Sequence, residues 1–489
     1  MTNSRTPLHR SLAGLLIFCL LISTIGARQF DLPDFGSSAD LVMTPTDERR
    51  LGQAFMRSVQ DALPVIDDPL LTDYIEELGR GLVAASDNAS GRYTFFLIDE
   101  PVINAFAGPD GIIGVYAGLI LAAESEAELA AVMAHEIAHV TQRHLFRSIE
   151  DQQRLSLPTT ALLIAAAILG AQISPDAGLA AVAGLQAASA QHQVNFTRDN
   201  EKEADRIGIG TLAGAGHDPF AMAGFFERLT KASRLYENNA PEFLRTHPVT
   251  TNRVAEAIDR AERYGYRQRP DSLRFHLTRA DLRQRSYRSP EKAVRHFEAT
   301  LRDKRYRNQM AEHYGYALAM ARAGRLDEAS REAKSLLDFK PTQAEFVVLA
   351  AIVKRRQGNM DTALQRLKQA VSLSPNSWPL RMAYGELLMD AARWADAADQ
   401  LDRVAKARPR NTKVFLLLAD AAGKAGRKTS VHRYRAEYYA LIGEIEPAIR
   451  QLEIALRNTR PSYHDASRIQ VRLQELETEM RDTKERKKR

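Results

Sequence analysis

The sequence has very little cysteine: Cys19 is the only one in 489 residues, so a disulfide-stabilised fold is excluded. It also lacks a strong excess of one charge, and a formal net charge of +6 is too small to argue for nucleic acid as a partner. A content of 45% hydrophobic and 26% charged residues is that of an ordinary globular protein and excludes disordered and collagen-like chains. The length predicts two or three domains.

The clearest long apolar run lies at the N-terminus. Two arginines precede the stretch LAGLLIFCLLISTI (residues 12–25), and the small residues Gly26 and Ala27 follow it. This layout is typical of a secretory signal peptide, and the run is short for a membrane-spanning helix. We therefore predict that residues 1–27 are a signal peptide. A mature chain without cysteine fits a bacterial periplasm.

The rest of the chain divides near residue 270 into two parts of different pattern. Residues 44–264 combine helical patterns with one strand-like segment, YTFFLID (93–99), and a glycine-rich stretch. Only alanine- and leucine-rich amphipathic helices follow. We predict a mostly helical α+β domain with a small sheet over residues 28–268, an all-α array over 269–480 and a basic tail over 481–489.

The second part repeats every 34 residues. Two sets of residues keep this spacing: Gly324, Gly358 and Ala392, and then Pro341, Pro375 and Pro409. Paired helices with this period resemble the tetratricopeptide repeat, whose stacked units form a concave surface for peptides or proteins. The pattern predicts roughly four to six units, and it does not identify the partner.

The stretch AHEIAHVTQRH carries the chemistry of the first part. His135 and His139 are four residues apart, so on a helix they direct two imidazoles at one point, as zinc requires. Glu136 lies about 100° around the helix from His135, where a hydrolytic general base is needed. Ser125 and Glu128 form a capping box that begins this helix.

A third ligand is the decisive test of this interpretation. Glu201 and Asp205, in the stretch RDNEKEADRIGI, again share one helical face, so a carboxylate would complete the ligand set while Asp205 holds a ligand histidine. His144 lies five residues after His139, about 140° around a continuous helix, and is predicted to face away. Gln142 and Leu145 stand where a metzincin has glycine and histidine, which excludes that class.

These two stretches, followed by THPVTTNR (246–253), resemble the M48 peptidases, the Ste24/HtpX-type zinc metallopeptidases. With an export signal and C-terminal tetratricopeptide repeats, the chain is most similar to the periplasmic BepA-type members. The resemblance implies a zincin-like domain, one zinc ion and a set of functional residues. These are the zinc ligands His135, His139 and Glu201, the general base Glu136, the supporting Asp205, and the assisting pair His247 and Arg253.

The resemblance also implies a function. It implies a periplasmic zinc endopeptidase with chaperone-like activity that acts in outer-membrane protein assembly and degrades misassembled precursors. Its partners would be those proteins and their assembly machinery, bound by the repeats. The alternative is a repeat chaperone or adaptor whose metal site is regulatory or rarely active. Glu136 favours the enzyme, because a vestigial metal site has no need of a carboxylate that binds no metal.

Two features leave alternatives open. His247 precedes Pro248 and is predicted on a loop, where it either takes the fourth zinc position and inhibits the enzyme or stabilises the oxyanion beside Arg253. We favour inhibition, because a broad-specificity protease needs restraint. The apolar stretches within residues 159–190 are each too short to span a bilayer, and are predicted as buried helices or as a peripheral membrane contact.

Overall fold

The structure is a computed structural model that describes residues 44–149, 164, 198–235 and 241–486. The predicted signal peptide, residues 159–190 apart from Ile164, and the last three residues of the basic tail lie outside the described residues. In the ranges that are described, every helix is too short or too polar to cross a membrane.

In the described part of the chain, two helices precede the sheet. They are α3 (Pro45–Ala62) and α4 (Pro69–Ala84), and both start with proline because its missing N–H costs nothing in the first turn. Each is capped by the preceding residue: Thr44 accepts a hydrogen bond from Asp47 N, and Asp68 accepts from the first backbone N–H groups of α4. The apolar face of each helix is buried.

The sheet is small and mixed. Its strands are β1 (Thr94–Ile98), β2 (Ala105–Gly108) and β3 (Ile112–Tyr116), in the order β1-β3-β2. β1 runs parallel to β3, whereas β2 runs antiparallel to it and forms an edge of the sheet. The strand predicted over residues 93–99 is confirmed by β1. The sequence did not separate β2 and β3 from the glycine-rich stretch.

A tight turn, η1 (Pro109–Gly111), joins β2 to β3. Asp110 and Gly111 have φ angles of 58° and 69° there, in the left-handed region. A Cβ atom on Gly111 would lie 1.9 Å from the carbonyl oxygen of Arg92, so only glycine fits. This turn fixes the register of the edge strand.

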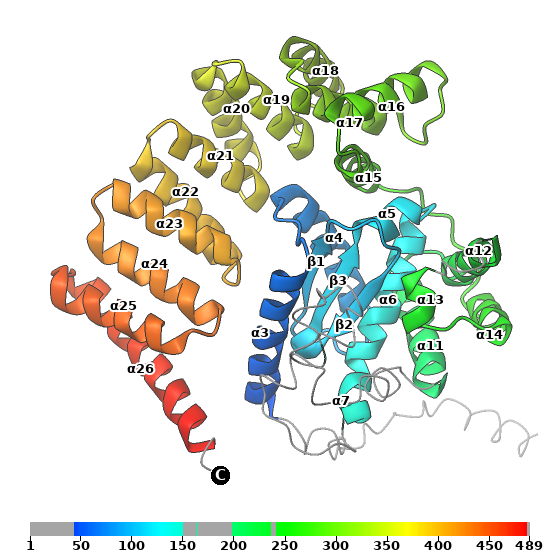
Figure 1. Ribbon diagram of the computed structural model, residues 1–489, viewed down its shortest axis with the longest axis horizontal. Helices are drawn as coiled ribbons and strands as arrows, with labels where there is room; N and C mark the ends of the chain where they lie inside the picture. Colours follow the sequence, from blue (N-terminus) through cyan, green and yellow to red (C-terminus); the bar gives the residue numbers. More distant parts are fainter. Residues whose placement is uncertain (1–43, 150–163, 165–197, 236–240, 487–489) are drawn as a thin grey trace, which may run out of the picture. The chain divides into compact units, whose positions relative to one another are not determined.

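The helices after the sheet build the rest of the domain. They are α5 (Ala117–Ala122), α6 (Glu126–Thr141), α7 (His144–Ile149), α11 (Arg198–Gly214), α12 (Ala221–Leu235), α13 (Glu242–Thr246) and α14 (Thr251–Glu262). α6 is buried continuously from Glu128 to His139 and lies between the sheet and α11 (Figure 1). A Cβ atom on Gly208 of α11 would lie 3.1 Å from the backbone nitrogen of His135, so these two helices are in close contact.

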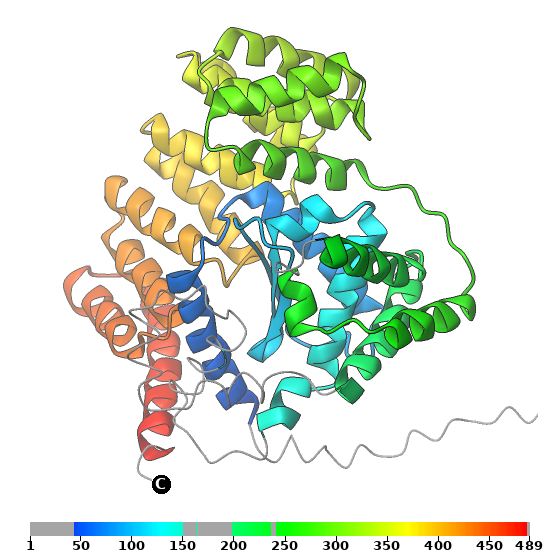
Figure 2. The same cartoon turned by 45° about the vertical axis from the view of Figure 1, so that its right-hand side comes forward.

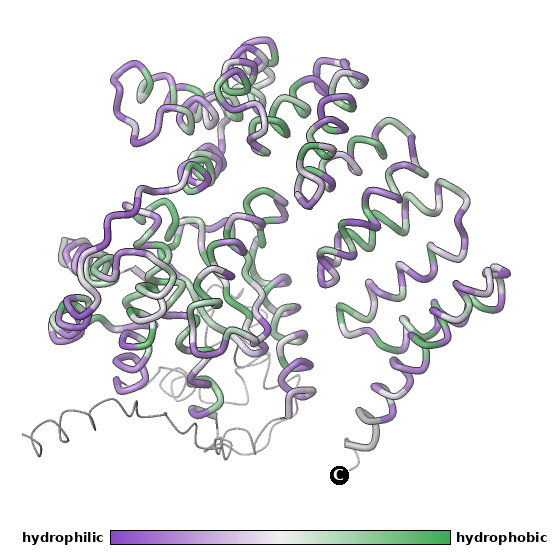
Figure 3. The backbone as a smooth tube through the Cα atoms, turned by 180° about the vertical axis from the view of Figure 1, so that it is seen from behind, coloured by the Kyte–Doolittle hydropathy of each residue, from purple (hydrophilic) through white to green (hydrophobic). Residues whose placement is uncertain are grey.

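The remaining helices form antiparallel pairs with the predicted repeat (Figure 2). They are α15 (Leu273–Ser286), α16 (Pro290–Arg302), α17 (Gln309–Arg322), α18 (Leu326–Phe339), α19 (Ala344–Arg356), α20 (Met360–Leu373), α21 (Trp378–Asp390), α22 (Trp394–Ala407), α23 (Thr412–Lys424), α24 (Lys428–Leu441), α25 (Ile445–Asn458) and α26 (Tyr463–Arg486). Gly324, Gly358 and Ala392 all have positive φ, of 80°, 83° and 56°, in the turns inside the pairs. The repeat markers therefore fall on the turns. Polar and apolar residues alternate along the helices (Figure 3).

The first helix of the array, α15, belongs to two hydrophobic cores. Phe275 and Leu282 are 0% and 1% exposed and pack with the sheet, α4 and α6. Leu277 and Ala280 on the same helix pack into the core of the array. The domain boundary at residue 268 stays a prediction, but the peptidase core includes side chains beyond it. At the other end, α26 extends through Arg486, into the stretch predicted as the tail.

Candidate metal centre

The helix α6 supplies two of the four residues of the centre. Ser125 caps it by accepting a hydrogen bond of 3.2 Å from Glu128 N, as the capping box predicted. His135 and His139 lie one turn apart and are 0% and 2% exposed. Their Nε2 atoms are 3.0 Å apart, so the two imidazoles meet at one point.

Two other elements bring their side chains to this point. Glu201 lies in the first turn of α11, with its Oε2 atom 3.5 Å from His135 Nε2 and its Oε1 atom 3.5 Å from His139 Nε2. His247 follows α13, and its Nδ1 atom lies 3.0 Å from Glu201 Oε1 and 3.3 Å from His135 Nε2. All four residues are buried, and their potential ligand atoms lie within 4.8 Å of one another.

This geometry fits zinc. Ligand atoms at about 2.0–2.1 Å from a tetrahedral zinc ion lie about 3.3 Å from one another, and the separations here are 3.0 to 3.5 Å. Imidazole nitrogen and carboxylate oxygen are also the ligand types that zinc accepts. Without a cation between them, the lone pairs of three imidazoles and a carboxylate this close would face one another and repel.

Glu136 lies beside the group without belonging to it. Its Oε1 atom is 3.5 Å from His247 Nε2, and its side chain is 0% exposed. Neither carboxylate oxygen has a hydrogen-bond partner among the described residues. Burial raises the pKa of Glu136. A buried carboxylate with free lone pairs beside a cation site has the properties of a proton acceptor.

Asp205 and Arg253 support the group from one side. Asp205 Oδ1 lies 3.0 Å from His135 Nδ1, the ring nitrogen that faces away from the centre. Arg253 donates to both oxygens of Asp205, at 2.7 and 2.8 Å, and its Nη1 atom lies 2.9 Å from Glu201 Oε2. Burial alone would raise the pKa of Asp205, but the contacts with Arg253 and His135 outweigh it and lower this pKa. Asp205 therefore stays ionised beside its histidine.

His144 lies on a different helix from His139. α6 ends at Thr141, and Arg143 has a φ of 52°, so the chain turns sharply and His144 begins the separate helix α7. Its Nδ1 atom lies 2.8 Å from His139 Nδ1. His144 is outside the group of four converging residues, as the sequence predicted, but it contacts the outer nitrogen of His139 because the helix assumed to be continuous ends before Arg143.

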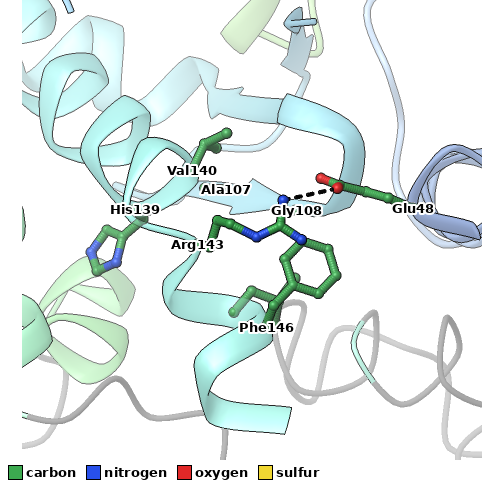
Figure 4. A pocket seen from close by; sticks show the side chains of 8 residues that line it. Glu48, Ala107, Gly108, His139, Val140, Arg143 and Phe146 are labelled. Atoms are coloured by element: carbon green, nitrogen blue, oxygen red, sulfur yellow. Dashed lines mark hydrogen bonds and ion pairs between the residues drawn. The ribbon is translucent and has the colours of Figure 1, made fainter. Parts of the chain in front are cut away.

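A pocket lies next to His139 (Figure 4). Its lining includes the backbone of Ala107 and Gly108 at the end of the edge strand β2. Arg143 crosses it, forms an ion pair of 3.3 Å with Glu48 and packs over the ring of Phe146 at 4.8 Å. The pocket thus lies between His139 and the end of the edge strand.

The fold and the site define a class: two histidines one turn apart, a glutamate from a second helix and an adjacent buried carboxylate are the parts of a metallopeptidase. Comparison with known proteins gives the family. Residues 69–261 match peptidase family M48, and residues 354–421 match the tetratricopeptide repeat. The chain belongs to peptidase family M48 and is a metalloendopeptidase with tetratricopeptide repeats.

The similar proteins include full-length relatives. The chain is 34% identical over 477 residues to the beta-barrel assembly-enhancing protease of Escherichia coli (strain K12), covering 96% of each chain. It is 36% identical over 450 residues to a putative beta-barrel assembly-enhancing protease of Vibrio cholerae, covering 89% of this chain and 90% of the other. A mitochondrial metalloendopeptidase of Danio rerio, OMA1, is 29% identical over 239 residues, or 47% of this chain and 49% of its own.

Proposed function

We propose that this chain is a periplasmic zinc endopeptidase that acts in the assembly of outer-membrane β-barrel proteins and degrades misassembled precursors. His135, His139 and Glu201 would hold the zinc ion, and Glu136 would be the general base. One observation carries the catalytic assignment: Glu136 is fully buried beside the ligand group, and neither of its oxygens has a hydrogen-bond partner in the described part of the chain.

The chemistry divides between the ion and the protein. Zinc, when bound, supplies a Lewis acid that polarises the scissile carbonyl and makes a nearby water acidic. Glu136 takes one proton from the attacking water and later gives it to the leaving amine, so that the peptide bond breaks with net addition of one water. The enclosed position of Glu136 keeps competing solvent away from this proton.

Arg253 and Asp205 would hold the ligand side chains in their orientation. Asp205 fixes the ring of His135 through its outer nitrogen, and Arg253 ties Asp205 to Glu201. Arg253 also donates to the carbonyl oxygen of Pro248 at 2.8 Å, which anchors the loop that carries His247. Arg253 would therefore hold the loop that carries His247 beside the metal centre.

His247 would restrain the enzyme. Its Nδ1 atom lies at the distance of a fourth ligand from His135 and Glu201, where a substrate carbonyl or water would otherwise bind. The other role, stabilisation of the oxyanion through its N–H, requires the ring to rotate out of this position. The observed contacts favour the inhibitory role.

Substrate would bind as an additional strand. β2 (Ala105–Gly108) is an edge strand of the sheet in the described part of the chain, while β3 is central. β2 also contacts α6, so a peptide paired with its outer edge would pass the metal centre. Main-chain pairing needs no particular side chains, which suits a broad range of unfolded substrates.

The repeats would bind the partners. The full-length relatives are named for enhancing β-barrel assembly, and this chain shares both their peptidase and repeat regions. We propose the same class of partner here: unfolded or misassembled outer-membrane proteins and their assembly machinery. A periplasmic location agrees with the N-terminal signal pattern. Peripheral membrane contact through residues 159–190 stays a prediction.

The decisive experiment compares wild type with Glu136→Gln on an unfolded β-barrel protein and on casein. We expect the variant to bind one zinc per chain but to cleave at least 10³-fold more slowly, because only the base is lost. Glu256→Gln, an exposed carboxylate on α14, is the matched control and should cleave normally. If Glu136→Gln cleaves like wild type, Glu136 is not the base. If wild type only prevents aggregation of the substrate, the repeat chaperone is the correct alternative.

A further inference from the structure

Each zinc-binding histidine has a second ring nitrogen that needs a partner, and the two histidines of α6 solve this differently. His135 has Asp205 directly beside its Nδ1 atom. The Nδ1 atom of His139 meets another histidine, His144, at 2.8 Å. His144 is 0% exposed, and its other nitrogen, Nε2, lies 3.0 Å from Glu203 Oε2. The catalytic steps described above use neither His144 nor Glu203.

The positions of the hydrogens along the row His139–His144–Glu203 follow from the way in which His139 binds the metal. If His139 binds the metal through Nε2, its Nδ1 atom must carry a hydrogen and donate it. His144 Nδ1 then accepts, which leaves the hydrogen of the His144 ring on Nε2, and that atom donates to Glu203 Oε2. Arg147 donates to the same oxygen at 2.9 and 3.0 Å, which holds the carboxylate in its ionised form. Each donor in the chain faces an acceptor.

We infer that His144 and Glu203 are positioning residues for the metal centre: a neutral His144 transmits the orienting effect of the Glu203 carboxylate to the ligand His139. The inference rests on the proposed zinc site. It makes the two sides of the centre equivalent, since each ligand histidine is then held by an ionised carboxylate with an arginine partner. For His135 this pair is Asp205 and Arg253, and for His139 it is Glu203 and Arg147, acting through His144.

The sharp turn after α6 makes this arrangement possible. Arg143 has positive φ, so the chain folds back and α7 starts with His144 beside His139. Glu203 comes from the same turn of α11 as the ligand Glu201 but points to the other side of the centre. One helix turn therefore supplies a ligand and an orienting carboxylate.

The test measures zinc affinity by competition with a chromophoric chelator, in the full-length protein. Loss of an orienting partner weakens metal binding by about 10- to 100-fold. We expect this loss in His144→Phe, which cannot accept the hydrogen bond, and a loss near the lower end in Glu203→Gln. His144→Asn should restore most of the affinity, because its side-chain oxygen can replace Nδ1 as the acceptor. Glu256→Gln is the matched control.

A spectroscopic measurement separates positioning from simple packing. In the cobalt-substituted protein, we expect the visible absorption bands to shift in His144→Phe and Glu203→Gln but not in Glu256→Gln. If His144→Phe and Glu203→Gln lower only the melting temperature of the metal-free protein, with unchanged zinc affinity and cobalt bands, His144 is merely a packing residue and the inference is overturned. Equal losses in His144→Phe and His144→Asn would also overturn it. If wild type binds no zinc, the proposed function fails together with the inference.

Discussion

Replacing His247 with alanine tests whether this side chain occupies the fourth position of the metal centre. The ring is 2% exposed and stacks on Phe243, with centroids 4.9 Å apart and an interplanar angle of 30°. Its Nδ1 atom also contacts the buried carboxylate of Glu201 at 3.0 Å. These two interactions hold the ring inside the site, and both are lost when it swings out to admit a ligand.

Their sum sets the size of the effect. An aromatic pair contributes about 0.5–1.5 kcal/mol, and the contact of Nδ1 in the centre, with the Glu201 carboxylate or with zinc in its place, contributes no less than a hydrogen bond to a charged group, about 1.5–3 kcal/mol. Moving the ring out therefore costs roughly 2–4.5 kcal/mol, which corresponds to an open fraction between about 1 in 30 and 1 in 2000. A ligand that needs the fourth position binds more weakly by that factor. His247→Ala should therefore bind it about 30- to 2000-fold more tightly.

The assay is calorimetric titration of acetohydroxamate, a small zinc-binding ligand, into the zinc-loaded protein. This measurement avoids the ambiguity of cleavage rates, because loss of an oxyanion donor would lower cleavage by about 10²–10³ and mask any gain. His217→Ala, which removes another buried histidine, 6% exposed, is the control. If acetohydroxamate binds wild type and His247→Ala equally, the ring does not block the site. If cleavage is also unchanged, both proposed roles of His247 are refuted.

Three further changes test the supports of the site. Phe275→Ala should lower the free energy of unfolding by about 3–5 kcal/mol, and with it the urea midpoint, because this ring is fully buried in the peptidase core. The same change at Phe339, which is 74% exposed, should cost less than about 0.5 kcal/mol. Equal urea midpoints for the two variants would contradict the packing of α15. Arg253→Met leaves two buried carboxylates, Asp205 and Glu201, without the arginine cation, so the free energy of unfolding of the metal-free protein should fall by about 3–5 kcal/mol in chemical denaturation. The loss should be smaller in the presence of zinc. No loss at all would show that these ion pairs do not stabilise the protein. Removal of zinc by a chelator should lower the melting temperature, with recovery on adding zinc but not magnesium, and an unchanged melting temperature would argue against a bound ion.

The metal centre was largely predictable because helical geometry fixes it locally. Residues four apart on a helix share a face whatever the tertiary structure, so the spacing of His135 and His139, and of Glu201 and Asp205, already paired them. Only their convergence depends on the fold. The contact between α6 and α11 that brings them together is close at Gly208, and nothing in the periodicity of α11 indicated that this glycine faces His135.

Features that depend on a break in regular structure were missed. β2 and β3 are short and fully buried, so they show no alternation of polar and apolar residues, and glycines at 108, 111 and 114 make the stretch look like a loop. His144 was placed by continuing the helix through Arg143, a residue that rarely adopts positive φ. Neither glycine nor proline occurs between Val140 and Leu145, so no residue there indicated a turn.

The boundary between the peptidase part and the repeats was also hard to predict from the sequence. A repeat period identifies units that stack on one another, and its markers Gly324, Gly358 and Ala392 fall in the turns inside the helix pairs. It does not show which core the first helix joins. α15 begins a helical pair, yet Phe275 completes the core beneath the catalytic helix, and Ser272, its capping residue, donates through both its N–H and its hydroxyl to Glu126 at the start of α6. A movement of the first repeat helix would therefore act on both the packing and the N-terminus of the helix that carries the metal-binding histidines.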